Sequence, residues 1–185
     1  DKIFVETLDL KQKLEEKNFS NIEILYNFKH IEKYDINKIR ESNSFCVFSR
    51  IIKEKGIGDA IYAINKLNEE GISSKLYIYG PVGKEYEEEF NGLIFSNQNV
   101  QYCGNVKPEE SGQYISKYWM LLFPTRFIKE GLPGTLIDSY NASTPVIASK
   151  WLSADEFVPD NVGYKYKFCD KDSLYNVMKY CINNY

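Results

Sequence analysis

The sequence predicts an α/β fold, a Rossmann-like, doubly wound parallel sheet, and three observations support this. Short apolar runs rich in β-forming residues alternate with amphipathic stretches of helical period. The runs are continuously apolar rather than alternating, which is typical of strands buried on both faces of a parallel sheet. The length of 185 residues and the hydrophobic fraction of 43% suffice for one domain with a sizeable core.

Five apolar runs are expected to be the strands of this sheet. They are Phe45–Ser49, Leu76–Tyr79, Val100–Cys103, Trp119–Phe123 and Val146–Ala148. Amphipathic helices are expected at 57–67, 86–94 and 174–182, and Gly71 stands where the C-terminal cap of the first belongs. Ligands of such sheets bind outside the carboxyl ends of the strands, so the loops after the strands should hold the functional site.

The first 43 residues follow a less regular pattern. Ile3–Thr7 and Ile22–Tyr26 are expected to be strands, Leu8–Lys17 a helix, and the polar stretch after them a linker. We therefore divide the chain into an arm with a crossover, residues 1–43, and a main domain, residues 44–185.

Composition argues against several classes of protein. A formal charge of −3 without a basic stripe disfavours a nucleic-acid binder. No apolar run reaches the roughly 18 residues of a membrane helix, and Asp1–Lys2 opens no signal peptide, so we expect a cytoplasmic protein. The four scattered cysteines are expected to be free thiols, and the single histidine, His30, excludes a metal site that needs two histidines.

The first candidate site is the loop after the strand at 45–49. Arg50 and Lys55 flank a strand-to-helix turn that Gly56 and Gly58 open, and cations beside a helix N-terminus favour phosphate. Ile61 stands where a dinucleotide fingerprint needs its third glycine, so a nicotinamide or flavin cofactor is not supported. On this loop alone, a solvated charged turn is favoured over a phosphate site.

The second candidate site follows the fourth expected strand. Pro133, Gly134 and Thr135 predict a helix start whose free amides face the carboxyl edge of the sheet. Glu130 would precede this helix, and Asp138 would lie about one turn inside it. The two carboxylates could bind hydroxyls at two ends of an extended sugar ligand, or be a solvated loop charge and a first-turn carboxylate. Spacing alone leaves both interpretations open.

Glu130–Ser149, EGLPGTLIDSYNASTPVIAS, resembles the nucleotide-sugar-binding signature of group 1, family 4-like retaining glycosyltransferases of the GT-B fold. That signature is a Glu, seven residues and a second Glu, followed by a small-residue stretch and a Pro-Val-Ile-Ala strand. Phe48–Gly56 resembles the family's diphosphate-gripping segment, and Val100–Val106 resembles the segment that meets the base. The resemblance covers about 44–180 and implies the C-terminal, donor-binding half of a GT-B enzyme.

The resemblance implies transfer of a sugar from a nucleoside-diphosphate sugar to an acceptor, in cell-surface polysaccharide or glycoconjugate synthesis. Arg50 and Lys55 would hold the donor diphosphate, together with the amides of Gly134 and Thr135. The resemblance implies neither a metal nor another cofactor, and it implies no nucleophilic side chain.

The remaining implied roles concern the sugar, the ribose and the base. Glu130, the implied catalytic residue, would orient the donor sugar. Asp138 would hold the ribose, although the family has a Glu at this position. The base region would comprise Tyr102, Cys103 and Gly104.

Residues 1–43 resemble the tail of the family's N-terminal domain, with the interdomain crossover at Ile24–Lys29. The acceptor would then be held by an N-terminal domain missing from this sequence, and the fragment alone would be inactive. We also consider an arm-mediated dimer and peripheral association of the full-length enzyme with the inner face of the membrane. Two alternatives stay open: a non-catalytic nucleotide-sugar-binding module, and a GT-B epimerase or phosphorylase.

Overall fold

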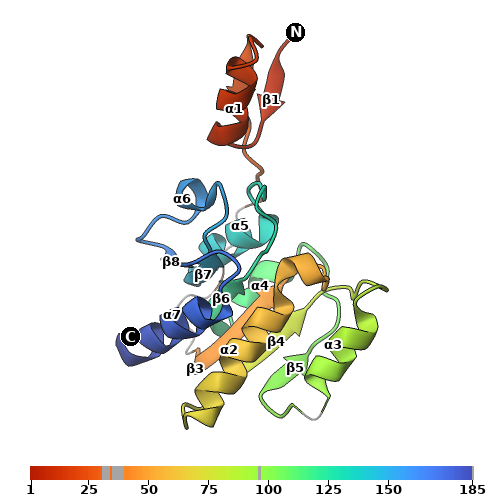
Figure 1. The fold of residues 1–185 in the computed structure, drawn as a ribbon, viewed down its shortest axis with the longest axis vertical. Coiled ribbons are helices and arrows are strands. Elements are labelled where there is room, and N and C mark those ends of the chain that lie inside the picture. Colours follow the sequence, from red (N-terminus) through yellow and green to blue (C-terminus); the bar gives the residue numbers. More distant parts are fainter. Residues whose placement is uncertain (31–33, 35–39, 96, 185) are drawn as a thin grey trace.

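The computed structural model describes residues 1–30, 34, 40–95 and 97–184. It consists of a three-layer α/β/α body and an N-terminal arm that projects from it (Figure 1). Residues 31–33 and 35–39, a part of the polar stretch that the sequence assigns to a linker, lie outside the described residues.

Six parallel strands form the central sheet of the described chain, in the order β5-β4-β3-β6-β7-β8. They are β3 (Glu41–Phe48), β4 (Lys75–Tyr79), β5 (Val100–Tyr102), β6 (Tyr118–Phe123), β7 (Val146–Ser149) and β8 (Gly163–Tyr166). The five predicted strands are confirmed. The sixth, β8, lies at the sheet edge with Tyr164 and Lys165 only partly buried, so its sequence lacks the continuous apolar run of the others.

Helices cover both faces of the sheet. They are α2 (Ile57–Glu69), α3 (Glu87–Ile94), α4 (Ser111–Ile115), α5 (Gly134–Asn141), α6 (Ala154–Phe157) and α7 (Lys171–Asn184), with a single 3-10 turn, η1 (Lys53–Lys55). Side chains of α2, α3 and α7 pack on one face, and those of α4, α5 and α6 pack on the other. The predicted doubly wound α/β fold is therefore confirmed.

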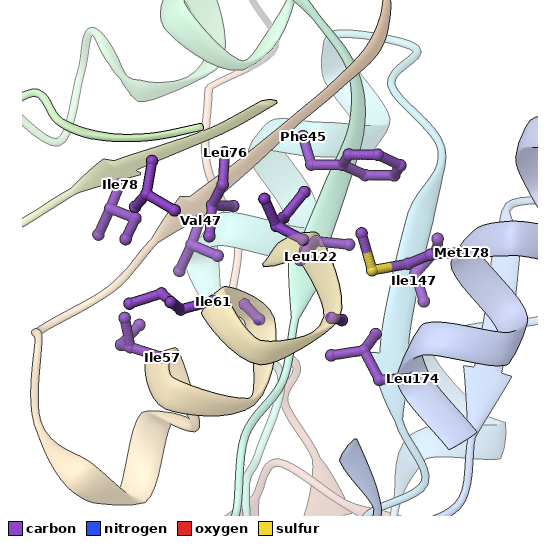
Figure 2. Close-up of a cluster of buried hydrophobic side chains, with 14 of the residues drawn as sticks. Phe45, Val47, Ile57, Ile61, Leu76, Ile78, Leu122, Ile147, Leu174 and Met178 are labelled. Carbon is purple, nitrogen blue, oxygen red and sulfur yellow. The ribbon is translucent and has the colours of Figure 1, made fainter. Parts of the chain in front are cut away.

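The central strands supply side chains to two cores because successive residues of a strand point to opposite faces. Phe45 and Val47 of β3 pack with Leu122 in the core beneath α2 and α7 (Figure 2). Cys46 and Phe48, the residues that alternate with them, belong to the second core. Burying one large apolar side chain stabilises a fold by about 1.5–3 kcal/mol, so both faces of such a strand need apolar residues.

The arm is a small βαβ unit formed by β1 (Ile3–Val5), α1 (Leu8–Glu15) and β2 (Ile22–Ile24), with β1 and β2 parallel. Thr7 caps α1 by accepting a hydrogen bond from the Leu10 amide. No residue of α1 is buried, and Phe4 and Leu25 are 56% and 52% exposed. The arm therefore presents apolar side chains that its own small core does not cover.

Helix α6 of the body contacts the arm and the crossover. The Leu8 amide donates to the Glu156 carboxylate, 3.1 Å from Oε2, and the Tyr26 ring meets Phe157 edge-on at 5.8 Å. The body's first strand, β3, begins at Glu41 rather than Phe45, and the division of the chain at residues 43 and 44 stays a prediction.

Three further features of the described residues bear on function. None of their helices is both long and apolar enough to cross a membrane. They contain no group of three or more His, Cys, Asp or Glu side chains placed to hold a metal ion. The four cysteines are free thiols, with Cys46 and Cys181 buried, Cys103 partly buried and Cys169 exposed.

Candidate functional site

The candidate site lies where the strand order of the sheet reverses. The chain runs from β3 outwards through β4 to β5, and then returns to pair β6 with the other side of β3. At such a switch point the loops after two adjacent strands diverge, and ligands bind in the crevice between them. These loops are 49–56, after β3, and 124–133, after β6. They carry Arg50, Lys55 and Glu130.

An ion pair joins the two loops. Lys55 Nζ lies 2.5 Å from Glu130 Oε2, and the two side chains are only 16% and 15% exposed. Thr125 Oγ1 donates to the same carboxylate oxygen at 3.0 Å. The structure thus brings together two residues 75 positions apart that the sequence assigns to the same site.

Two backbone features fix this arrangement. Gly56 has φ +66°, and a Cβ atom there would lie 1.9 Å from the Pro124 carbonyl oxygen, so only glycine allows the two loops to approach. The Arg126 amide donates to the Glu54 carbonyl at 2.8 Å. The Arg126 guanidinium also binds both carboxylate oxygens of the buried Asp59, at 2.6 and 2.9 Å. These contacts place Lys55 beside Glu130.

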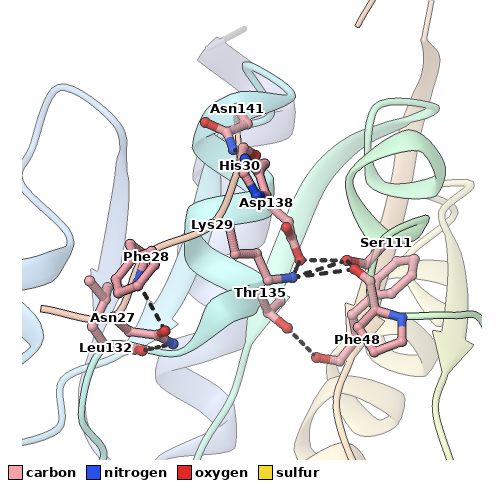
Figure 3. Close-up of polar contacts among 11 residues, drawn as sticks. Asn27, Phe28, Lys29, His30, Phe48, Ser111, Leu132, Thr135, Asp138 and Asn141 are labelled. Atoms are coloured by element: carbon pink, nitrogen blue, oxygen red, sulfur yellow. Dashed lines mark hydrogen bonds and ion pairs between the residues drawn. The ribbon is translucent and has the colours of Figure 1, made fainter. Parts of the chain in front are cut away.

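The N-terminus of α5 lies at the same edge of the sheet. The helix begins at Gly134, as predicted, and Pro133 provides no side-chain cap. Thr135 Oγ1 donates to the Phe48 carbonyl at 2.9 Å, which holds the helix start against the end of β3 (Figure 3). The first amides of a helix have no intrahelical partner, and its N-terminus carries partial positive charge. This end of α5 therefore suits an anion.

Asp138, one turn inside α5, belongs to a second polar cluster. The side chain is 8% exposed, and its Oδ2 atom lies 2.5 Å from both Lys29 Nζ and Ser111 Oγ (Figure 3). Lys29 comes from the crossover that follows the arm, and Ser111 opens α4. The Lys29 ammonium also lies 3.4 Å from the Pro108 carbonyl oxygen.

Two cavities open beside the two acids. Asp138 lines one of about 280 Å³, which Lys29, His30 and Pro108 also border. Glu130 lines another of about 440 Å³ between the arm and the body, with Glu6 on the arm side. The two acids thus line different cavities.

Arg50 and the predicted base region lie apart from these clusters. Arg50 is exposed, and its guanidinium has no hydrogen bond or ion pair with any residue that the structure describes. Tyr102 packs edge-on against Phe90, and its hydroxyl donates to the Gly80 carbonyl at 2.9 Å. Neither residue lines the cavity beside Asp138. The roles of both stay predictions.

Cys103 and Gly104 continue from the end of β5. The Cys103 amide donates to the Ile78 carbonyl at 2.8 Å, and burial raises the pKa of its thiol, which disfavours the thiolate at neutral pH. The Gly104 carbonyl accepts from the Gly80 amide at 3.0 Å. Both residues are thereby fixed at the carboxyl edge, two strands away from β3.

The sequence did not predict Lys29, Ser111 or Thr125 as site residues. In the structure, each donates a hydrogen bond to one of the two predicted acids, Asp138 or Glu130. Thr125 lies in the loop that begins where β6 ends, so the rule that ligands bind after parallel strands could have identified it. Lys29 precedes the central sheet, and Ser111 opens α4 well beyond the end of β5, so neither stands directly after a strand and neither carries a local signal.

Comparison with known proteins places this geometry in a family. Residues 29–185 match the family model described as glycosyl transferases group 1. The chain therefore belongs to the group 1 glycosyltransferases, the family that its sequence resembles. No curated protein matches the chain in sequence.

Solved structures with a similar fold include several glycosyltransferases. A mutant of S. aureus TarM in complex with fondaparinux, alpha-GlcNAc-glycerol and UDP superimposes with a TM-score of 0.85 at 17% identity, over 99% of this chain and 37% of that one. Anabaena HepE in complex with UDP gives 0.80 at 15% identity, over 99% and 54%. The pneumococcal O-GlcNAc transferase GtfA in complex with UDP and GlcNAc gives 0.73 at 20% identity, over 97% and 37%.

These likenesses show the shared fold. The present chain spans between 37% and 54% of the length of the three solved chains.

Proposed function

We propose that this chain is the donor-binding half of a retaining glycosyltransferase and that it binds a nucleoside-diphosphate sugar at the switch point of its sheet. One observation carries the proposal. A lysine and a carboxylate from the two loops at the switch point are paired beside an uncapped helix N-terminus. Cations and a helix N-terminus suit a diphosphate, and carboxylates suit the hydroxyls of a sugar and a ribose.

In this proposal the cationic groups serve the leaving diphosphate. Lys55 and Arg50 neutralise the negative charge that grows on the diphosphate as the bond to the sugar breaks. The amides of Gly134 and Thr135 add donors that are already oriented and need no reorganisation during the reaction. The transfer then needs neither a bound metal nor a nucleophilic side chain, and we name none.

The two carboxylates serve the two ends of the donor. Glu130 faces the cavity of about 440 Å³ between arm and body, and we place the sugar there, with Glu130 orienting its hydroxyls. Asp138 borders the cavity of about 280 Å³, and we place the ribose there. Because Lys55 lies against Glu130, we place the diphosphate between the two spaces, at the start of α5.

The acceptor belongs to the part of the protein that we propose to be an N-terminal domain outside this sequence. The chain spans 54% or less of the three solved structures, and the arm exposes Phe4 and Leu25. We propose that these side chains pack against that domain and, in the isolated chain, against a second copy. The fragment alone would then transfer no sugar. Synthesis of a surface polysaccharide or glycoconjugate in the cytoplasm, beside the membrane, is the role we propose for the full-length enzyme.

Calorimetric titration of the purified chain with UDP, GDP, ADP and the corresponding nucleosides tests the proposal. We choose UDP as the first probe because HepE and GtfA were solved with it. At least one diphosphate should bind at least about tenfold more tightly than its nucleoside, because the nucleoside lacks the charge-assisted contacts. Absence of binding by all three diphosphates would contradict the proposal.

A further inference from the structure

The acid that we assign to the ribose is bonded to the crossover rather than to the strand loops of the sheet. Lys29 Nζ lies 2.5 Å from Asp138 Oδ2, 3.4 Å from the Pro108 carbonyl oxygen and 3.5 Å from Ser111 Oγ. Its ammonium therefore connects three segments: the crossover, the turn before α4, and α5. Figure 3 shows Lys29 reaching from the crossover to this cluster.

We propose that Lys29 is a positioning residue of the nucleotide site, which holds the Asp138 carboxylate in the orientation that binds the ribose hydroxyls. The inference rests on the proposed function, since it assigns a role within the same site. It makes recognition of the ribose depend on a residue outside the central α/β domain.

Burial explains why Asp138 needs such a partner. The Asp138 side chain is 8% exposed, and a buried carboxylate is costly unless it is paired and hydrogen-bonded. Among the described residues, Lys29 supplies the only cation within ion-pair distance of Asp138. Ser111 adds a neutral donor to the same oxygen, but a hydroxyl does not compensate a full negative charge.

The geometry leaves the acid able to bind a ligand. The bonds from Lys29 and Ser111 both end on Oδ2, so neither occupies Oδ1. Asp138 and Lys29 also border the same cavity of about 280 Å³, so the pair faces open space on one side. Vicinal hydroxyls of a ribose donate two hydrogen bonds, and a carboxylate fixed through one oxygen offers the other in a constant direction.

The placement of Lys29 also ties the site to the arm. Asn27 Nδ2 donates to the Leu132 carbonyl at 3.2 Å, two residues before α5 begins, and the chain continues directly into Lys29. A Cβ atom on Gly134 would lie 3.0 Å from Lys29 Cε, so the lysine stem packs against the helix start. The crossover therefore packs against the start of α5 at Gly134, the end that we assign to the diphosphate. It forms an ion pair with α5 at Asp138, the end that we assign to the ribose.

Titration of UDP and of 2′,3′-dideoxy-UDP into the wild-type chain, Lys29→Met and Lys29→Arg tests the inference. The wild type should prefer UDP over the analogue, which lacks both ribose hydroxyls, by about tenfold or more. Lys29→Met should bind UDP about tenfold more weakly while its affinity for the analogue changes little, so the preference disappears. Lys29→Arg should restore part of the preference because it keeps the charge. Adding Asp138→Asn to Lys29→Met should cause no further loss of preference.

Lys117→Met is the matched control, because Lys117 is an exposed lysine just before β6, at the amino ends of the strands and therefore opposite the candidate site. It should leave both affinities unchanged. An unchanged preference in Lys29→Met, or equal losses for UDP and its analogue, would overturn the inference; equal losses would mean that Lys29 contacts the diphosphate or only stabilises the fold. The titration uses the diphosphate that the wild type binds and its dideoxy analogue, and failure to bind any of UDP, GDP and ADP would overturn both this inference and the proposed function. A wild type that binds UDP without preference would remove the ribose role of Asp138 and therefore that of Lys29.

Discussion

The two acids of the site are each paired with a lysine, but the two pairs are built differently. Lys55 and Glu130 come from adjacent loops at one edge of the sheet, and both side chains are about equally buried. Asp138 is more deeply buried than its partner Lys29, which reaches it from the crossover beyond the sheet. The first pair is a product of the Rossmann-like topology, whereas the second depends on how the crossover lies against the domain.

The two ion pairs therefore depend on different parts of the protein. The position of Lys55 relative to Glu130 is fixed by contacts within the α/β body, through Gly56 and Arg126. The position of Lys29 relative to Asp138 is fixed by a segment that joins the body to the arm. Changes within the body loops should therefore affect the sugar and diphosphate end of the site, and changes in the crossover should affect the ribose end.

Gly56→Ala should cause the largest loss of stability. It should disrupt the Lys55–Glu130 pair and leave the Lys29–Asp138 pair in place. The new Cβ would lie 1.9 Å from the Pro124 carbonyl oxygen, and φ is +66°. Left-handed strain and overpacking against backbone should together lower the free energy of unfolding by about 3 kcal/mol or more. Chemical denaturation measures this loss.

Gly71→Ala is the matched control for Gly56→Ala. Gly71 also has a positive φ, +81°, but a Cβ atom there would have nothing within 4 Å. It should cost only the strain, about 1–2 kcal/mol. Equal losses in the two variants would show that the close approach of the two loops does not matter.

Lys55→Met should lower both the affinity for a nucleoside diphosphate and the melting temperature. It removes the charge-assisted contact that we propose to the diphosphate, and we expect binding of a nucleoside diphosphate to fall by about 1.5–3 kcal/mol, with little change for the nucleoside. It also leaves Glu130 partly buried without its cation, so the melting temperature should fall as well.

Arg50→Met sharpens the comparison with Lys55→Met. The Arg50 side chain is exposed and has no partner among the described residues, so its loss should weaken the diphosphate without lowering the melting temperature. Calorimetry combined with thermal unfolding separates the two variants. If Arg50→Met leaves diphosphate affinity unchanged, the phosphate role of Arg50 is wrong.

Thr125→Val should cause only a small loss of stability and of affinity for a sugar-bearing donor. The Thr125 hydroxyl donates to Glu130 Oε2 at 3.0 Å and accepts from the Phe127 amide at 3.1 Å, and valine conserves the shape without either bond. Loss of these bonds should lower stability by about 1–2 kcal/mol. Affinity for a sugar-bearing donor should fall slightly while that for the nucleoside diphosphate is kept. A larger loss for the diphosphate would assign Thr125 to the other end of the donor.

The same contrast explains how much the sequence could predict. The five continuous apolar strands, the start of α5 at Gly134 and the loops that carry Lys55 and Glu130 were predictable, because buried parallel strands leave a local pattern. The edge strand β8 has only partly buried central residues, and α4 is a short helix of five residues, so neither leaves such a pattern.

The partners of Asp138 were not predictable for a different reason. Lys29 lies 109 positions from Asp138, in a polar segment without a period, and its contact exists only because the crossover folds back onto α5. A single sequence gives no signal for such a contact. Ser111 is likewise brought to the acid by the packing of α4 beside α5.

The proposed function assigns the sugar to Glu130 and the ribose to Asp138. Titration of UDP and UDP-glucose into Glu130→Gln and Asp138→Asn tests it most directly, with the wild type as reference. Glu130→Gln should weaken UDP-glucose by about 1.5–3 kcal/mol and leave UDP nearly unchanged, whereas Asp138→Asn should weaken both, because both ligands carry the ribose. If Glu130→Gln abolishes UDP binding, or Asp138→Asn leaves it unchanged, the assignment of the two acids is wrong.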